Sequence, residues 1–391
     1  MGLDSRNITP ELAGAVVFLA SEIRSFERAG VAIRRVLKQK LSTSTIRRVA
    51  KDVGSELTEE TFDGNDQEVV VPQVAVVSCD GGRIRTREPG NGRGVCPSGE
   101  NGWRETKNAS LERMVLSEDV DDDDPCPDLP TTFRSAEKVS KITEKPVPNV
   151  DKTPRGKGKR TVYSGPKRIL RTVLASMANS NAFGPMMHRE AQRRRFHESS
   201  RRAFLGDGLP WNWTIWKRHF PTFTPILDFI HAIHYVFDAA MAVTEEEVEG
   251  WECYVRHITL CWQGRVDDVI RELTVVCSER GINLEEKLAD DDPNKALTDA
   301  VRYLTNNRSR MDYPRYRRLG LPVTSSPMES LVKQINLRVK GTEMFWDDPD
   351  GAEAILRLRA AALSDDGRLE RYLENRPGCS FVRRPTLAIA T

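Results

Sequence analysis

The clearest hydrophobic pattern in the chain is a short β-branched run at residues 74–77, which follows Pro72 and leads into Ser78-Cys79-Asp80 and two glycines. Apolar runs of this length between Pro and Gly are typical of buried strands. We therefore predict a strand over 74–80 with Asp80 at its end, where the chain leaves the sheet. A second apolar run ends in Asp207-Gly208 and predicts another strand-end aspartate. An aspartate that merely begins a turn is the alternative for each.

The remaining pattern predicts a mixed α/β chain. Two further strands are expected at 82–87 and 103–115, so that the sheet opens as a three-stranded meander. Helices are expected at 168–179 and 185–202, and residues 224–235 begin as a strand and become helical. Helical periodicity continues over 236–310, which is longer than a simple connection requires. The last helices are expected at 350–362 and 366–374.

The first part of the chain predicts three helices, at 9–27, 32–38 and 41–53. Thr9-Pro10-Glu11 and Ser42 are typical helix starts. The third helix carries Arg47, Arg48 and Lys51 on its polar face. A short helix, a turn and a basic helix resemble a helix-turn-helix motif that binds DNA. A small helical bundle with a solvated basic face remains the alternative.

Residues 117–166 predict a flexible segment without a fold of its own. An acidic block occupies 118–124, and a basic stretch rich in Gly occupies 155–160. The acidic block is interpreted as a solvated loop rather than a cation site, because nothing in it fixes a geometry.

Composition narrows the class of protein. The 391 residues suffice for two or three domains, and the net charge of +2 does not by itself indicate a nucleic-acid partner. We find no apolar run of about 18 residues, and the first residues lack the pattern of a signal peptide. Seven cysteines without a C-x-x-C pair indicate a reducing compartment and no structural zinc site. We therefore expect a cytoplasmic protein without a membrane span.

Charge is distributed unevenly along the chain. The predicted helix before the second strand-end aspartate carries several cations, Arg193, Arg194 and Arg195 among them. Positive potential beside a cleft favours contact with a DNA backbone. A solvated basic helix face is the alternative.

Three acids form the candidate catalytic set: Asp80, Asp207 and Glu329, the last at a predicted helix start. Two strand-end aspartates and a helix-borne glutamate suit two Mg²⁺ ions, with Mn²⁺ as a substitute, in phosphoryl transfer. Supporting residues are expected around them. Asp228 and His231 share one helix face, while Lys333, Asn336 and Lys340 continue a polar stripe from Glu329. A core histidine and a solvated polar face are the alternatives for these two groups.

With these motifs in view, the chain resembles bacterial insertion-sequence DDE transposases of the ISKra group, distant relatives of the Mutator-like transposases. The resemblance extends over 2–373. It rests on SCDGG at 78–82, WRETK at 103–107, LGDG at 205–208, DFIH at 228–231 and SPMES at 326–330, with Lys333, Asn336, Arg338, Lys340 and Trp346. Members usually carry a cysteine-rich segment ahead of the point where this sequence begins, and the 118–124 and 152–160 segments also depart from the pattern.

The resemblance implies a ribonuclease H-like core with Asp80, Asp207 and Glu329 as metal ligands, and a functional role for Asp228 and His231. It also implies double-stranded DNA as substrate, strand cleavage, transfer by a 3′-OH and a homo-oligomer on DNA. The alternatives are a DNA-binding repressor derived from a truncated element and a ribonuclease H-like nuclease. The organisation we expect is a DNA-binding segment at 1–60, core at 68–116, linker at 117–166, core at 167–235, helical insertion at 236–310, and third-acid and C-terminal helices at 311–375.

Overall fold

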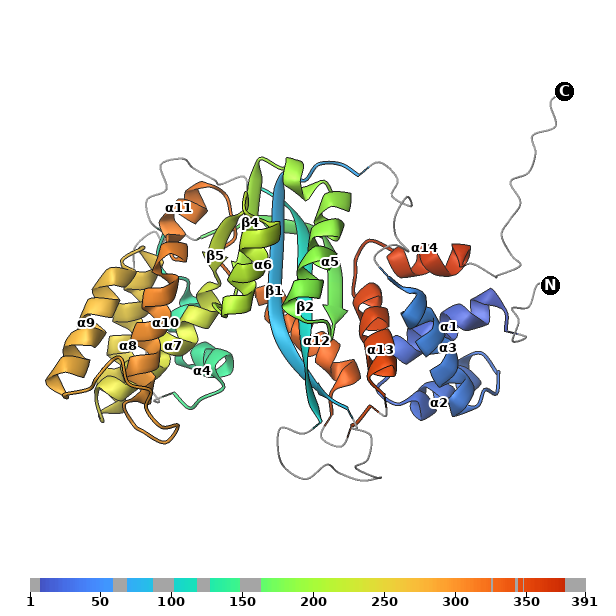
Figure 1. Ribbon diagram of the computed structural model, residues 1–391, viewed down its shortest axis with the longest axis horizontal. Coiled ribbons are helices and arrows are strands. Elements are labelled where there is room, and N and C mark those ends of the chain that lie inside the picture. The colour runs from blue at the N-terminus through green and yellow to red at the C-terminus, as the bar shows by residue number, and fades with distance from the viewer. Residues whose placement is uncertain are drawn as a thin grey trace.

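Figure 1 shows a computed structural model of the chain. It describes residues 8–58, 69–86, 102–117, 127–147, 163–324, 326–341, 344–346 and 348–376. The acidic block at 118–124 and the basic stretch at 155–160 lie outside these residues. None of the helices that the structure describes is long and apolar enough to cross a membrane.

The centre of the molecule is a five-stranded mixed sheet with the strand order β3-β2-β1-β4-β5. The strands are β1 (Val74–Arg85), β2 (Trp103–Val115), β3 (Lys167–Ser176), β4 (Arg201–Gly206) and β5 (Thr224–Leu227). The first three pair antiparallel, whereas β4 is parallel to β1 and β5 is parallel to β4. The chain is therefore mixed α/β, and its sheet is compatible with a ribonuclease H-like fold.

The first strand is longer than the sequence pattern predicts. β1 continues through the glycine pair to Arg85, so the expected separate strand at 82–87 does not exist and Asp80 lies in mid-strand. Gly81 and Gly82 stay extended because they pair with Lys107 and Thr106 of β2. Cross-strand pairing thus overrides the turn signal of the glycines, and the prediction of Asp80 at a strand end is wrong.

A second correction concerns 168–179, where we expected a helix. Residues 167–176 form β3, the sheet edge, and pair with β2 over its length. Val173 and Ala175 of β3 are buried against the helical layer that contains α13 (Pro349–Ala362). Pairing and packing distant in sequence therefore decide this segment.

Helices cover both faces of the sheet (Figure 1). Helix α5 lies in front of the sheet in that view, while α12 lies behind it and packs against β1. The helices that follow β3 are α5 (Ser180–Arg193), α6 (Pro210–His219), α7 (Phe229–Val243), α8 (Glu247–Trp262), α9 (Val266–Glu279), α10 (Lys295–Asn307), α11 (Tyr313–Arg318), α12 (Ser326–Val339), α13 and α14 (Arg368–Asn375). The helical character of 236–310 and of the C-terminus is as predicted.

Three helices form at the N-terminus: α1 (Pro10–Glu22), α2 (Phe26–Val36) and α3 (Thr43–Glu56). Ser42 caps α3 as expected, since its side chain accepts a hydrogen bond from the Thr45 amide. α1 ends and α2 begins earlier than predicted, because Ser25 caps α2. α1 and α3 both pack against α13, so the N-terminal helices contact a helix near the C-terminus. The structure does not confirm a helix-turn-helix motif in this region.

Part of the expected linker is folded. Residues 127–147 hold a 3-10 turn (Thr131–Arg134) and helix α4 (Ala136–Thr143). Phe133 and Val139 join the main hydrophobic core, and α4 packs against α7. The prediction of an unfolded segment is therefore wrong for these residues, whose apolar positions were too few to signal a helix.

Candidate active site

Asp80 is placed by the sheet itself. It lies opposite Asn108 in the β1–β2 register, so the two side chains project from the same face. Its Oδ1 accepts a hydrogen bond of 2.6 Å from the Gly81 amide. The neighbouring Cys79 projects to the other face, where its Sγ lies 3.1 Å from Oδ1 of Asn212 in α6.

Asp207 directly follows β4, as predicted. The parallel register sets Gly206 beside Cys79, which brings Asp207 to the level of Asp80. Its Oδ1 accepts hydrogen bonds from the Leu209 amide at 2.8 Å and from Asn212 Nδ2. These bonds hold the carboxylate at the point where the chain turns away from the sheet.

Glu329 lies in the first turn of α12, as predicted. α12 packs on β1 across the face that bears Asp80. Two turns after Glu329, Oδ1 of Asn336 comes within 4.0 Å of the position that a Cβ atom on Gly82 would occupy. Helix and strand are therefore close enough for Glu329 and Asp80 to share one site.

Asp228 and His231 complete the group. Asp228 caps α7, and its amide donates to the Gly206 carbonyl at 3.0 Å, which links it to the Asp207 turn. Its Oδ2 lies 3.8 Å from Nε2 of His231, so the two side chains meet across one helical turn as predicted.

The charges of four acids act on one histidine, His231. Burial alone would lower the pKa of His231, but the charges of Asp228, Asp80, Asp207 and Glu329 raise it. Burial raises the pKa of Asp80 to about 6, against the opposing charge of His231. Burial likewise raises the pKa of Asp207 and that of Glu329. We call Asp80, Asp207, Asp228, His231 and Glu329 the acid cluster.

The acid cluster has the chemistry of a site for hard cations, because its acids offer only oxygen ligands. Within the described part of the chain, no three His, Cys, Asp or Glu side chains stand in a ligating arrangement. Asp80 and Asp207 are instead satisfied by neighbouring amide groups. Burial nevertheless leaves these carboxylates poorly solvated when they are ionised, and Mg²⁺ or Mn²⁺ would supply a compensating charge.

The other basic residues that we predicted to support the site or to bind DNA are either exposed to solvent or paired with an acid. Lys333 is exposed on α12, and Lys340 lies just after the helix with its Nζ 5.5 Å from the centre of the Trp103 ring. Arg48 is exposed on α3, but Lys51 and Arg47 pair with Asp348 at 2.7 and 3.9 Å.

The predicted basic cluster of α5 is largely compensated within the protein. Arg193 and Arg194 have side chains 8% and 11% exposed and pair with Glu190, while Arg195 pairs with Glu198. Their charge stabilises the fold, and we leave these three arginines out of the proposed DNA surface.

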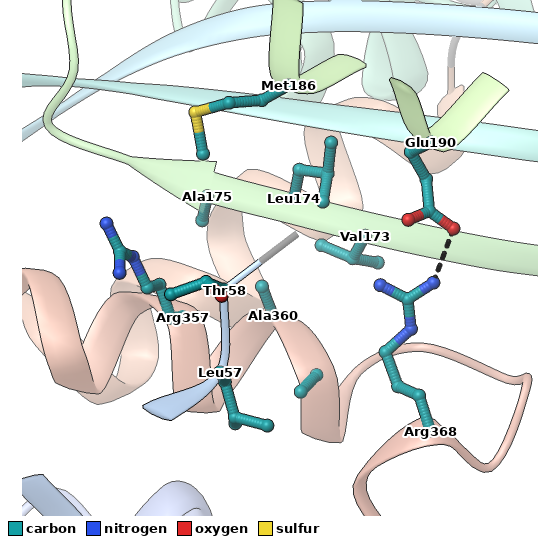
Figure 2. A pocket seen from close by; sticks show the side chains of 11 residues that line it. Leu57, Thr58, Val173, Leu174, Ala175, Met186, Glu190, Arg357, Ala360 and Arg368 are labelled. Carbon is teal, nitrogen blue, oxygen red and sulfur yellow. Dashed lines mark hydrogen bonds and ion pairs between the residues drawn. The ribbon is translucent and has the colours of Figure 1, made fainter. Parts of the chain in front are cut away.

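A separate cavity lies between α5, β3 and α13 (Figure 2). Its wall is mostly aliphatic, with Val173, Ala175 and Met186 among the lining residues. Its charged side is the ion pair between Glu190 and Arg368, at 2.6 Å. No acid-cluster residue lines it, so the cavity is not part of the candidate active site.

Sequence reasoning missed three residues that lie beside these acids: Asn108, Asn212 and Tyr303. Asn108 faces Asp80, Asn212 holds the Asp207 carboxylate, and Tyr303 of α10 donates from its hydroxyl to the Asp207 carbonyl at 2.6 Å. The sequence around these three residues offers no signal that distinguishes them from other polar residues.

No protein-family model and no curated protein sequence matches this chain. Among solved structures, the Drosophila P element transposase strand transfer complex is similar at 10% sequence identity and a TM-score of 0.28, over 94% of this chain and 81% of that one. A likeness at this level carries no weight for function. The resemblance to the ISKra group therefore rests on sequence motifs alone.

Proposed function

We propose that this protein is a DDE-type DNA transposase that cleaves and joins DNA strands at the acid cluster. The observation that carries the proposal is that Asp80 and Asp207 lie at the same level on neighbouring strands, and that their charges and that of Glu329 all act on His231. Their side chains are half-buried and come from β1, the end of β4 and the start of α12. The substrate is double-stranded DNA, and a homo-oligomer on DNA belongs to the same proposal.

In this proposal Asp80, Asp207 and Glu329 hold two divalent cations, Mg²⁺ or Mn²⁺. Bound there, the ions would supply Lewis acidity, which lowers the pKa of a water molecule and stabilises charge on a leaving oxygen. The protein supplies the rigid geometry: Asn212 and the Leu209 amide fix Asp207, and the Gly81 amide fixes Asp80. Asp228 restrains His231, and the neighbouring acids favour the protonated form of this histidine.

The DNA backbone is expected along α12. Lys333 and Lys340 are exposed there, and Arg85 lies 4.4 Å from the centre of the Trp103 ring next to Lys340. Cations on one side of the acid cluster suit a phosphate backbone, which carries a negative charge at every nucleotide.

The test is an in vitro reaction with a labelled DNA fragment that spans the sequences flanking the gene, a target plasmid and Mg²⁺, Mn²⁺ or EDTA. We expect joined products with either metal and none with EDTA. Cleavage without joining would favour the nuclease, and binding by folded protein without cleavage would favour the repressor.

Asp207→Asn sharpens this test. It keeps the size of the side chain and should abolish cleavage while sparing DNA binding. Asp312→Asn is the matched control, because Asp312 also accepts a main-chain amide hydrogen bond, from Arg315 at 3.2 Å, at a helix start outside the acid cluster. Cleavage by Asp207→Asn at the wild-type rate would rule out the proposed site.

A further inference from the structure

Asn108, which lies opposite Asp80 in the β1–β2 register, has no role in the function proposed above. Asn108 is only 1% exposed, yet neither its Oδ1 nor its Nδ2 has a hydrogen-bond partner among the described residues. A buried polar atom without a partner costs about 1–3 kcal/mol, so two on one side chain call for a physical reason.

Asn108 belongs to a group of polar atoms that meet over Gly82. A Cβ atom on Gly82 would lie 2.6 Å from Oγ1 of Thr106, 3.1 Å from Nδ2 of Asn108 and 4.0 Å from Oδ1 of Asn336. Only glycine lets these groups approach the strand so closely. The three side chains come from β2 and α12, and they lie on the face of β1 that bears Asp80.

The chemistry of this group suits a water molecule beside an ion. A bound water needs two to four polar partners, and an amide can both donate and accept. Partners that hold the surroundings of a metal in place are part of its binding energy. Asn336 stands on the helix of Glu329, so a water shared with Asn108 would also link the sheet to the third acid.

Building on the proposed function, we propose that Asn108 is a positioning residue for cation uptake by the acid cluster. With Asn336 and Thr106 it holds a water molecule next to Asp80 when Mg²⁺ or Mn²⁺ is bound. Its two polar atoms then have partners in the loaded protein, at the expense of stability in the cation-free protein.

The experiment titrates the full chain, without DNA, with MgCl2 and MnCl2 by calorimetry, and follows thermal unfolding in EDTA. Asn108→Leu should bind either ion about tenfold more weakly. It should unfold at the same or a higher temperature in EDTA, because it removes two unpartnered polar atoms. Wild-type affinity in Asn108→Leu would overturn the proposal.

Thr86→Val is the matched control. Thr86 is fully buried at the end of β1, pairs with Trp346, and also has an Oγ1 without a partner in the described structure. This variant should leave cation affinity unchanged. A loss equal to that of Asn108→Leu would show a general effect of altering the sheet, and would overturn the specific role of Asn108.

Asn108→Asp covers the case in which the leucine variant fails to fold. It has the same shape and adds a carboxylate oxygen, so it should bind Mg²⁺ more tightly than the wild type if Asn108 faces the ion. Unchanged or weaker binding would overturn the proposal. If the wild type itself takes up no cation, the proposed function falls as well; if only the Asn108 variants behave like wild type, this inference alone falls.

Discussion

The hydroxyl group of Tyr303 donates a 2.6 Å hydrogen bond to the main-chain carbonyl of Asp207. The Tyr303 ring also stacks on Tyr235 of α7 at a centroid distance of 3.7 Å, and it would collide with any side chain at Gly208, whose φ is +98°. The helical insertion therefore holds the turn that carries the second acid.

We expect Tyr303→Phe to slow DNA cleavage by up to about tenfold, because a hydrogen bond of about 0.5–1.5 kcal/mol no longer holds the Asp207 turn. The ring and its stacking on Tyr235 remain, so DNA binding should not change. Single-turnover cleavage rates measure the effect. Tyr254→Phe is the control, since its hydroxyl also donates to a main-chain carbonyl, that of Phe133 at 2.8 Å, away from the acid cluster. Equal losses in both variants would contradict the role of Tyr303.

Lys333 is the exposed cation that we expect to contact the DNA backbone. Lys333→Ala should weaken binding to all sequences alike and reduce the slope of log K against log salt by about 0.9. Fluorescence anisotropy at several salt concentrations measures both quantities. Lys287→Ala, at an exposed position of the helical insertion, should leave the slope unchanged. An unaltered slope in Lys333→Ala would place the DNA elsewhere.

The sequence predicted those parts of the fold that local patterns determine. The strand ending at Gly206, the helix start that carries Glu329 and the cap at Ser42 are formed by neighbouring residues. Gly81-Gly82 misled because glycines suggest a turn, whereas here Gly82 lets Thr106 and Asn108 approach the strand. β3 was missed because its partners lie far away in sequence.

The charged residues of the acid cluster were predictable from the sequence, whereas the residues that hold them were not. Carboxylates near apolar runs and the pair Asp228 and His231 are visible in a sequence, and in the structure their charges act on one another. The residues that hold them, Asn212 and Tyr303, follow no spacing that links them to Asp207. A run of arginines in the sequence does not show which cations are already paired, because ion pairing with Glu190 and Glu198 depends on the folded chain.

Removing one acid should stabilise the cation-free protein. Burial raises the pKa of Asp80 to about 6, so folding favours the protonated carboxyl group over the ionised carboxylate. The folded protein is therefore not destabilised by this group below the unfolded pKa near 4, and it loses stability as the pH rises from there to about 6. We therefore expect Asp80→Asn to unfold at a higher temperature than the wild type at pH 7 in EDTA. Mg²⁺ should raise the unfolding temperature of the wild type but not that of Asp80→Asn. A variant less stable than wild type in EDTA would contradict this account.

The ion-pair network beside the cavity between α5, β3 and α13 predicts a stability effect with the opposite pH dependence. Glu190 accepts from Arg193 at 2.8 Å, from Arg194 at 2.9 Å and from Arg368 at 2.6 Å. Burial would raise the pKa of Glu190, but these arginines outweigh burial and lower it. Glu190→Gln should cost about 3–5 kcal/mol at pH 7, because Arg368, 2% exposed, loses a compensating charge.

The sign of this effect follows from the lowered pKa. A carboxylate whose pKa is lower in the folded protein stabilises it above the unfolded pKa of about 4.3, and that contribution disappears as the pH falls through the folded value. The difference in unfolding temperature between wild type and Glu190→Gln should therefore be largest near pH 7 and shrink steadily below pH 4. Glu198→Gln, which breaks the exposed pair with Arg195, is the control and should unfold like the wild type at every pH. A difference for Glu190→Gln that does not change with pH would mean that packing around the cavity, rather than charge, makes Glu190 necessary.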